Sequence, residues 1–351
     1  ESTKQLSSEE YPCLEYEDVI PETGQLNKDI HEKKVQKTGI IFDNNKVLYG
    51  KLRPYLHNWI APEFTGVATG DWWVLNPCGN NKDFLYALIQ TKQFDTITNQ
   101  STGSKMPRAD WKLVSSAEFY VPPIEEQREI GKCFHIIDNL ISLHQRKLTK
   151  LQLLKKSMLT KMFPKDGARV PEIRFQGFHG DWEQRKVSDI CSISTGKSNT
   201  QDKEDDGIYP FYVRSPIIEH SNKYLYDEEA VLTVGDGVGT GKVFHYVNGK
   251  YDLHQRVYRM YGFSDNISAK FFYQYFSKEF YNRVMAMTAK TSVDSVRYKM
   301  IADMDIQLPS KAEQDKIAKF LFSFDGLISL HQRKLSKLQQ IKQAMLSKLF
   351  V

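Results

Sequence analysis

Two short stretches carry residue types that could bind phosphate or a nucleotide cofactor. STGKS (Ser194–Ser198) resembles the end of a phosphate-binding loop, but the pattern GxxxxGK[ST] needs glycine at position 191, where the chain has Cys191. GDGVGTG (Gly235–Gly241) follows an apolar stretch, but Thr240 breaks the GxGxxG spacing. The residues after it, KVFHYVNGKY, favour a strand with an Asn-Gly turn, where a cofactor loop would open a helix. We therefore expect no nucleotide site at either stretch.

A third stretch, VPPI (Val121–Ile124), has two prolines in the arrangement of an amino-methyltransferase motif. It has Val121 where an Asn or Asp would accept the proton of the target amine, so it is better explained as the start of a helix. No constellation of carboxylates occurs in both halves of the chain. These residues predict a protein that performs no reaction of its own.

The histidines and cysteines also give no catalytic or metal-binding pattern. His144 and His331 occupy matching positions of a repeat, where a buried or mutually paired histidine is favoured over a catalytic one. Cys13, Cys78, Cys133 and Cys191 are scattered, with no CxxC and no histidine pair at ligand spacing. We expect four reduced thiols and no zinc site.

The elements that would position any site are organised around a stretch that occurs twice. LISLHQRKLTKLQLLKKSMLTKMF (140–163) returns 187 residues later as LISLHQRKLSKLQQIKQAMLSKLF (327–350), with 17 of 24 positions identical. The match extends upstream, where Glu126-Gln127 corresponds to Glu313-Gln314. Prolines precede each copy, acidic residues follow in the first turns, and Lys and Arg fill the far ends. Each copy is predicted to be one helix of about 40 residues, roughly 60 Å long.

Apolar residues in both copies recur at alternating spacings of four and three, which is typical of a coiled coil. A single stripe needs a partner, and the other copy is available, so we expect the two helices to pair antiparallel with pseudo-two-fold symmetry. After residues 151 and 338 the stripe should shift to Leu154 and Met158, and to Ile341 and Met345. The predicted helix-pairing seam consists of Ile137, Ile141, His144, Leu148 and Leu151 with Phe324, Ile328, His331, Leu335 and Leu338.

Each helix is preceded by a segment with the composition of a globular domain. Both segments place strand-rich sequence first, then a helix (84–97 or 270–285), then a polar loop and a last strand. The second segment also has an opening section, PEIRFQGFHGDWEQRKVSDICSISTGKSNT, that the first does not show, so we expect an N-terminal part of the first domain to be missing. The predicted fold class is α+β, with domains at 1–122 and 164–308 and helices at 123–163 and 309–351.

The overall composition is that of a soluble protein with no apolar run of 18 residues, and a cytoplasmic location is expected. The net charge of +5 is small, but basic residues concentrate in the distal part of each helix. One interpretation is a solvated helix face that also complements the helix dipole. The other is an electrostatic surface for phosphates or an acidic partner.

The combination of these features resembles the specificity subunit of bacterial type I restriction-modification enzymes. The resemblance is carried by the tandem LISLHQRKL helices, the helix starts PPIEEQREI and PSKAEQDKI, the PEIRFQGFHGDWEQRKV opening, and GKLRPY in the first domain. It covers essentially the whole chain apart from the missing opening section of the first domain. It implies a non-catalytic subunit that recognises DNA, in which each domain reads one half of an asymmetric two-part target and the paired helices set the gap.

The resemblance also implies partners and their cofactors. Members of the family bind double-stranded DNA and two modification subunits, which use S-adenosylmethionine to methylate adenine, and the helices and their flanks are the docking surface. Two restriction subunits then join, motors with nuclease domains that use ATP and Mg. No cofactor or metal is expected in this chain, and no membrane association.

Sequence-specific DNA recognition needs polar and basic residues on loops that reach base edges and phosphates. For any one candidate, ordinary surface charge is as good an explanation as a base contact, so the prediction concerns the loops as sets. The glycine-rich turn at 235–241 is expected to be either structural or DNA-facing. The candidates are Lys51, Arg53, His57, Ser104, Lys105 and Arg108 in the first domain, and Lys242, His254, Gln255, Arg256, Lys290, Thr291, Ser292 and Arg297 in the second.

Two other classes of function compete with this one. The chain could be a scaffold in which the helices dimerise and the domains bind proteins and not nucleic acid. It could also be a lone methyltransferase or nuclease, which the failed motifs disfavour. Co-purification with a methyltransferase, without methyl transfer by the chain alone, would distinguish a specificity subunit from both.

Overall fold

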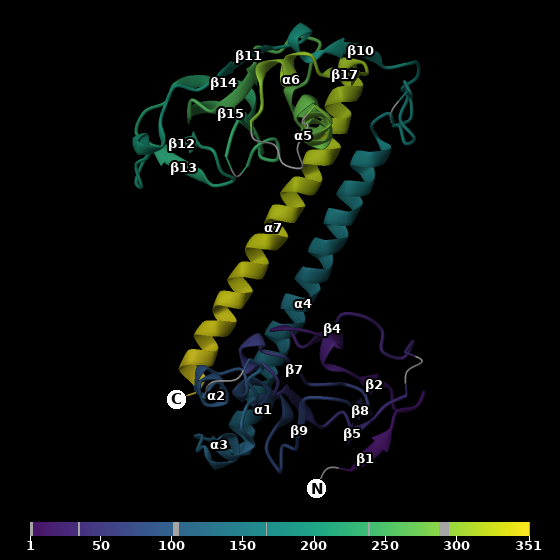
Figure 1. Cartoon of the computed structure of the whole chain (residues 1–351), viewed down its shortest axis with the longest axis vertical. Helices are drawn as coiled ribbons and strands as arrows, with labels where there is room; N and C mark the ends of the chain where they lie inside the picture. Colours follow the sequence, from purple (N-terminus) through teal and green to yellow (C-terminus); the bar gives the residue numbers. More distant parts are fainter. Residues whose placement is uncertain are drawn as a thin grey trace. The chain divides into compact units, whose positions relative to one another are not determined.

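The computed structural model describes residues 3–33, 36–100, 105–165, 167–237, 239–287 and 295–350. The chain forms two compact units, one comprising residues 1–149 and 329–351 and the other residues 150–328 (Figure 1). Unit 1 therefore contains the beginning of one long helix and the end of another, and unit 2 contains the remaining half of each. The predicted α+β class is confirmed, with strand-rich domains on two long helices.

Unit 1 contains two main sheets. One has the order β1-β5-β8-β2 and the other β7-β6-β9, while β3 and β4 form a separate pair. Three short helices follow the strands. The elements are β1 (Lys4–Leu6), β2 (Cys13–Leu14), β3 (Val19–Ile20), β4 (Gln25–Leu26), β5 (Thr38–Phe42), β6 (Val47–Gly50), β7 (Trp59–Ile60), β8 (Gly66–Ala68), β9 (Trp72–Leu75), α1 (Lys82–Leu88), α2 (Lys92–Thr98) and α3 (Trp111–Ser116), with 3-10 turns η1 (Tyr16–Asp18) and η2 (Pro54–Leu56).

Unit 2 is built around a six-stranded sheet of order β11-β16-β14-β15-β12-β13, and β10 pairs with β17 beside it. The aromatic face of α5 covers the sheet, with Phe271, Phe272, Phe276 and Phe280 fully buried. The elements are β10 (Glu183–Lys186), β11 (Ser192–Thr195), β12 (Tyr209–Tyr212), β13 (Ile218–Ser221), β14 (Tyr226–Val234), β15 (Phe244–Leu253), β16 (Val257–Tyr261), α5 (Ala269–Ala286), α6 (Tyr298–Ala302) and β17 (Asp305–Leu308), with 3-10 turns η3 (Val187–Asp189) and η4 (Thr200–Asp202).

The two units share a structural plan that the strand registers make explicit. In unit 1, β6 lies between β7 and β9, with Gly50 opposite Trp72. In unit 2, β14 lies between β15 and β16, with Val234 opposite Val257. The short helices α3 and α6 begin at Trp111 and Tyr298, the pair that the sequence repeat places opposite each other. The expectation of a shared order of elements therefore holds here.

The long helices are α4 (Ile124–Lys161) and α7 (Lys311–Leu349), and both begin in the same way. The buried side chain of Gln127 accepts from the Asn81 N–H at 2.9 Å and donates to the Pro122 carbonyl at 2.8 Å. Gln314 likewise accepts from the Ser268 N–H at 2.9 Å and donates to the Pro309 carbonyl at 2.9 Å. Asn81 and Ser268 are the N-caps of α1 and α5. One glutamine thus joins each long helix to the domain that precedes it.

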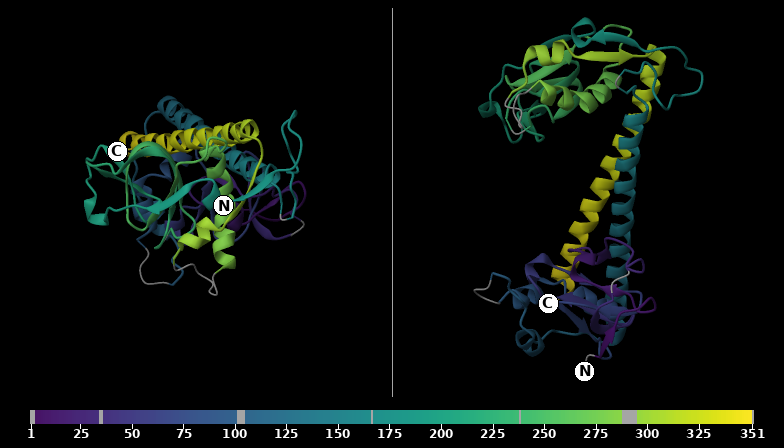
Figure 2. Two further views of the ribbon diagram at one scale, coloured as in Figure 1. Left: turned by 90° about the horizontal axis from the view of Figure 1, so that it is seen from above. Right: turned by 45° about the vertical axis from the view of Figure 1, so that its right-hand side comes forward.

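The helices pack together antiparallel, since each unit holds one end of α4 and the opposite end of α7 (Figures 1 and 2). In unit 1, Leu346 of α7 packs in one cluster with Ile130 and Phe134 of α4, and His144 Nδ1 lies 2.8 Å from His331 Nδ1. In both helices, partly buried residues recur at the predicted spacings of four and three, whereas Leu143 and Leu330 between them are exposed.

The predicted shift of the stripe is confirmed for Met158 and Met345, which are partly buried and packed, but it is wrong for Leu154 and Ile341, whose side chains are exposed. The positions after them are partly buried instead, and each holds a lysine in an ion pair with the other helix. Lys155 Nζ lies 2.5 Å from Asp325 Oδ1 in unit 2, and Lys342 Nζ lies 2.6 Å from Asp138 Oδ1 in unit 1. The lysine stems cover the apolar contact while their charges meet a carboxylate, which explains why an apolar residue is not needed there.

Three local predictions also differ from the structure. The expected helix 84–97 is two helices, because Thr91 caps α2 by accepting from the Phe94 N–H. Asn248-Gly249 makes no turn but continues β15, since both residues pair with β14. Residues 117–123 are not a strand, and Tyr120 is 85% exposed. Their counterpart β17 is a strand because β10 pairs with it, and the described part of unit 1 offers no such partner.

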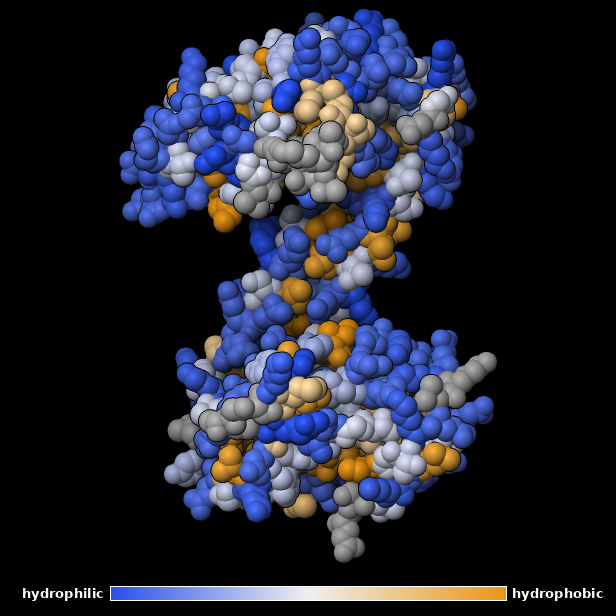
Figure 3. Space-filling view, viewed as in Figure 1, coloured by the Kyte–Doolittle hydropathy of each residue, from blue (hydrophilic) through white to orange (hydrophobic). Residues whose placement is uncertain are grey.

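The visible face of each unit is mainly hydrophilic, with scattered apolar residues (Figure 3). Among the helices that the structure describes, none is long and apolar enough to span a membrane. All four cysteines are free, and Cys13 is buried. No group of three or more potential metal ligands occurs among the described residues.

Candidate nucleic-acid interface

Each unit has a point where three backbone segments meet, which we call the junction. In unit 1, the Lys51 N–H donates to the Asp71 carbonyl at 2.9 Å and the Ala109 N–H to the Lys51 carbonyl at 2.8 Å. Leu52 and Arg108 form an antiparallel bridge there, and the Arg53 N–H donates to the Pro107 carbonyl at 2.7 Å. The junction therefore fixes the backbone of residues 50–53, 71–72 and 107–109.

The junction of unit 2 repeats these backbone contacts. The Gly235 N–H donates to the Arg256 carbonyl at 2.8 Å, and the Val296 N–H donates to the Gly235 carbonyl at 2.7 Å. Asp236 and Ser295 form the corresponding antiparallel bridge. The junction comprises residues 234–236, 256–257 and 295–297. The Gly235–Gly241 turn thus begins at a structural junction, next to arginine side chains.

Ion pairs occupy both junctions, but the acid and the bases stand at different positions of the shared backbone plan. In unit 1, Arg108 donates from Nε to Asp71 Oδ1 at 3.0 Å and from Nη2 to Asp71 Oδ2 at 3.1 Å. Lys51 Nζ lies 3.9 Å from the same carboxylate. In unit 2 the acid is Asp236, at the position of Leu52, and Arg256 takes the position of Asp71. Both surfaces therefore present arginine around one carboxylate.

The Asp236 carboxylate lies between two arginines. Arg214 Nη1 is 3.5 Å from Oδ1, and Arg256 Nε is 3.7 Å from Oδ2. Both arginine side chains are about half exposed or more, whereas the Asp236 side chain is mostly covered. Two positive groups around one acid leave the junction with a net positive charge, which suits a phosphate-bearing ligand.

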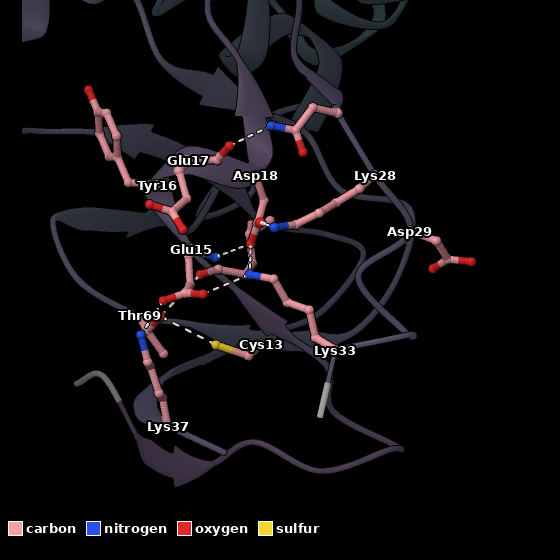
Figure 4. A network of polar contacts seen from close by, with 12 residues as sticks. Cys13, Glu15, Tyr16, Glu17, Asp18, Lys28, Asp29, Lys33, Lys37 and Thr69 are labelled. Atoms are coloured by element: carbon pink, nitrogen blue, oxygen red, sulfur yellow. Dashed lines mark hydrogen bonds and ion pairs between the residues drawn. The ribbon is translucent and has the colours of Figure 1, made fainter. Parts of the chain in front are cut away.

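In unit 1, a network of charges fixes the turn that begins η1 (Figure 4). Lys33 Nζ donates to Glu15 Oε2 at 2.7 Å and to the fully buried Asp18 at 2.5 Å, and Lys37 also pairs with Glu15. Hydrogen bonds from these two lysines lower the pKa of Glu15 to about 2. From the same turn, Tyr16 Oη donates to the Leu52 carbonyl at 2.5 Å, so Tyr16 links this turn to the junction.

The structure brings several of the predicted residues of unit 1 together. Lys51, Arg53 and Arg108 lie at the junction, and Lys105 is exposed on the segment that leads to it. Arg53 adopts a left-handed backbone conformation with φ of 47°, which an L side chain rarely takes, and its Nε is buried without a hydrogen-bond partner. Ser104 lies outside the described residues.

His57 is the C-cap of η2, the turn whose N-cap is Arg53. Its Nε2 is 2.9 Å from Asp95 Oδ1 of α2, its Nδ1 is 3.3 Å from Glu22 Oε1, and its ring stacks on Trp59. Its backbone is also left-handed, with φ of 53°, at the end of η2. These contacts give His57 a structural place between η2 and α2.

In unit 2, Arg256 and Arg297 are exposed at the junction, and Gln255 is exposed next to it. Gln255 donates to the Asn199 side chain. Lys242 is exposed further along the loop, where its Nζ lies 4.8 Å from the centre of the Tyr281 ring. Lys290, Thr291 and Ser292 lie outside the described residues.

The prediction of a surface role for His254 is corrected by the structure. The residue is only 4% exposed, and its Nδ1 accepts from the Arg256 N–H at 3.0 Å. Burial, and then the nearby Arg214, lower its pKa, which favours the neutral ring that this acceptor role needs. His254 therefore shapes the turn that carries Arg256 and does not reach the surface.

Asp71, Asp236 and Arg214 are the junction residues that sequence reasoning did not identify. Acidic side chains are not expected on a surface for nucleic acid, so neither aspartate was considered. Arg214 lies in YVRSP, far from the other candidates in sequence. The repeat of the helices does not align these loops, and only the backbone contacts of the junctions make their correspondence visible.

Comparisons with known proteins point to one family. Residues 21–153 and 179–340 match the family model described as type I restriction modification DNA specificity domain. The type I restriction enzyme MjaVIII specificity subunit of Methanocaldococcus jannaschii is 24% identical over 292 residues, 76% of this chain and 69% of that protein. The EcoDI specificity subunit of Escherichia coli is 27% identical over 163 residues, 46% of this chain and 35% of that protein.

A solved structure has the same fold over the whole chain. The crystal structure of the type I restriction-modification system S subunit from M. genitalium superposes with a TM-score of 0.73 at 16% identity, covering 100% of this chain and 96% of that one. At this identity the likeness establishes the fold.

Proposed function

Because the chain belongs to the family of type I restriction modification DNA specificity domains, we propose how its two units divide the recognition of a DNA target. The chain is a specificity subunit, and its function is target recognition. In our proposal each unit reads one half of a bipartite sequence with the loops around its junction. The observation that carries this is the pair of junctions, which have the same backbone contacts and different side chains.

The difference between the junctions supports an asymmetric target. Unit 1 presents Lys51 and Arg108 around Asp71, while unit 2 presents Arg214 and Arg256 around Asp236. Arginine and lysine suit both phosphate contacts and the acceptors of guanine in the major groove. Two unlike surfaces would select two unlike half-sites. If both approach one side of the duplex, the half-sites would be centred about one helical turn, near 10 bp, apart.

The paired helices α4 and α7 would set the gap between the half-sites. The ion pairs Lys155–Asp325 and Lys342–Asp138 and the contact of His144 with His331 support a fixed register between the helices. A rigid spacer would make the required number of intervening base pairs a property of helix length and independent of the bases read.

The reaction chemistry is assigned to partner subunits. In the proposal, two modification subunits dock on the helices and their flanks and supply S-adenosylmethionine-dependent adenine methylation. Two restriction subunits with ATP and Mg would complete the assembly. This chain would contribute binding and orientation alone, in the cytoplasm of the host.

Methylome sequencing tests the proposal. A host that carries this chain with its modification subunit should acquire methyladenine in one asymmetric, two-part motif, and exchanging residues 164–308 for those of another member should change only one half of it. A protein-binding scaffold would leave the methylome unchanged and would not shift duplex DNA in a gel. The chain alone should transfer no methyl group from S-adenosylmethionine to DNA.

A further inference from the structure

Arg108 is held at the junction of unit 1 more firmly than a surface arginine usually is. Its backbone is fixed by the bridge to Leu52 and by the hydrogen bonds of the neighbouring residues Pro107 and Ala109. Its side chain is nevertheless 53% exposed. Arg108 thus has a fixed backbone and a guanidinium that solvent or a ligand can reach.

Asp71 determines which edge of that guanidinium is free. It accepts from Nε at 3.0 Å and from Nη2 at 3.1 Å, which uses the side edge of the group. A guanidinium has five N–H groups in one plane, so the two hydrogens of Nη1 and the second hydrogen of Nη2 remain. They lie on the edge away from the carboxylate. This free edge carries two donors with the spacing that matches the O6 and N7 acceptors of guanine.

Asp71 is itself held in place. Its carbonyl accepts from the Lys51 N–H at 2.9 Å, and its side chain is only 24% exposed. A carboxylate on a DNA-binding surface repels phosphate and lowers affinity for every sequence. General affinity for DNA therefore does not explain why Asp71 lies at the centre of a basic junction.

Unit 2 gives an independent second case. A carboxylate, Asp236, again lies at the centre of the junction, although it stands at the position of Leu52 and not at that of Asp71. It faces Arg256 and Arg214, both exposed. The two units therefore reach the same arrangement of exposed arginine against a covered acid from different positions of the same backbone plan.

We infer that Asp71 is a positioning residue that orients Arg108 to read a guanine in the half-site of unit 1, and that Asp236 does the same for the arginines of unit 2. This inference rests on the proposed function. To the proposed function it adds the base that is recognised and the residue that recognises it. It also adds an acid that lowers general affinity for DNA and increases discrimination between bases.

The test is a binding selection with the full-length chain, in complex with its modification subunit, on duplex DNA containing randomised positions. The variants are Asp71→Asn, which keeps the shape and removes the charge, Arg108→Ala, and Arg108→Lys, which keeps the charge but cannot form a two-pronged contact. Asp43→Asn is the matched control, because Asp43 is an exposed acid that pairs with Lys46 at 3.4 Å in the turn between β5 and β6, outside the junction and off the long helices.

The expected result has two parts. Asp71→Asn, Arg108→Ala and Arg108→Lys each reduce the preference for G·C at the same single position, roughly tenfold or more, and leave the other half-site unchanged. Asp71→Asn also binds unselected duplex DNA as tightly as the parent chain or more tightly, because a negative charge is gone. Asp43→Asn changes neither quantity.

A merely structural role for the ion pair would give a different result. Asp71→Asn would then lower affinity for all sequences alike with every base preference retained, and the inference would be overturned. It would also be overturned if Arg108→Lys kept the full preference for G·C. If the unmodified complex selected no sequence at all, the proposed function itself would fail, and the inference with it.

Discussion

His144 and His331 face each other across α4 and α7 with their Nδ1 atoms 2.8 Å apart, 187 residues apart in the chain. At this distance one ring must donate and the other accept, so at most one of the two nitrogens in contact can carry a proton. Burial, followed by the neighbouring His331, Lys334 and Lys147, lowers the pKa of His144. Protonating both rings would place two positive charges in direct contact between the helices.

The histidine pair should make helix pairing sensitive to acid. The pKa of His144 is lower in the folded chain than in the unfolded one, so its contribution to stability is present above the unfolded value, near 6.5, and is lost as the pH falls below it. We expect the melting temperature to fall between pH 7.5 and 5.5. The double variant H144Q/H331Q should lose part of that dependence.

His245 and His254 also have lowered pKa values because of burial, and they contribute with the same sign. The informative quantity is therefore the difference in melting temperature between the parent chain and the double variant, measured by circular dichroism at several pH values. An identical pH dependence of the melting temperature in both proteins would show that the histidine pair does not contribute to it.

Glu15 should respond to acid at lower pH. Its pKa is lowered to about 2, first by the hydrogen bond from Lys33 and then by that from Lys37, so its contribution is present above the unfolded value and is lost between about pH 4 and 2. Glu15→Gln should loosen the turn that carries Tyr16 at neutral pH. Hydrogen exchange should rise in residues 13–20 of the variant at pH 7, and the two proteins should converge near pH 2.

The two glutamine clamps give a pair of matched variants. Gln127→Ala leaves the buried N–H of Asn81 without its acceptor, and Gln314→Ala does the same to Ser268. A buried group without its hydrogen bond costs about 1–3 kcal/mol. Each variant should raise hydrogen exchange at the start of one long helix and in the short helix attached to it.

The other unit is the internal control for each clamp. Gln127→Ala should affect α1 and the start of α4, while α5 and the start of α7 keep the parent exchange rates. Equal effects on both units, or none in either, would contradict the interpretation that each glutamine joins one helix to its own domain.

Removing one partner of an ion pair between the helices should lower the free energy of unfolding more than replacing both partners with apolar residues. Lys155 is largely covered and pairs with Asp325, which also accepts from Gln274 at 3.1 Å. Asp325→Ala leaves the covered ammonium unpaired and should destabilise unit 2 by about 1–3 kcal/mol. The double variant K155M/D325L should recover part of the loss, because an apolar pair can replace a covered ion pair. Urea unfolding would measure both, and an equal loss in the single and double variants would count against this account.

The repeat in the sequence was sufficient to predict the parts of the fold that depend on local pattern. The spacing of apolar residues predicted α4 and α7, and the matched Gln127 and Gln314 marked where each begins. The pairing of His144 with His331 also followed from their matching positions. These features are predictable because a helix is set by residues close in sequence and the two copies preserve their contacts.

Features that depend on distant partners were not predictable in the same way. Asn248-Gly249 has a turn sequence, yet pairing with Glu228 and Glu229 keeps it in a strand. His254 is of a residue type that could contact DNA, but the packing of its loop buries it. The roles of Asp71 and Asp236 come from backbone contacts between segments far apart in the chain, which no spacing rule encodes.

The most direct test of the two-unit account is to shorten both helices by one seam period. Deleting residues 145–151 and 332–338 keeps the phase of the seam and removes about 10 Å of helix, equivalent to roughly 3 bp of duplex. Methylome sequencing should then show the same two half-sites separated by a gap that is shorter by about that amount. An unchanged gap, or half-sites of altered sequence, would contradict the claim that the helices measure distance while the two units read the bases.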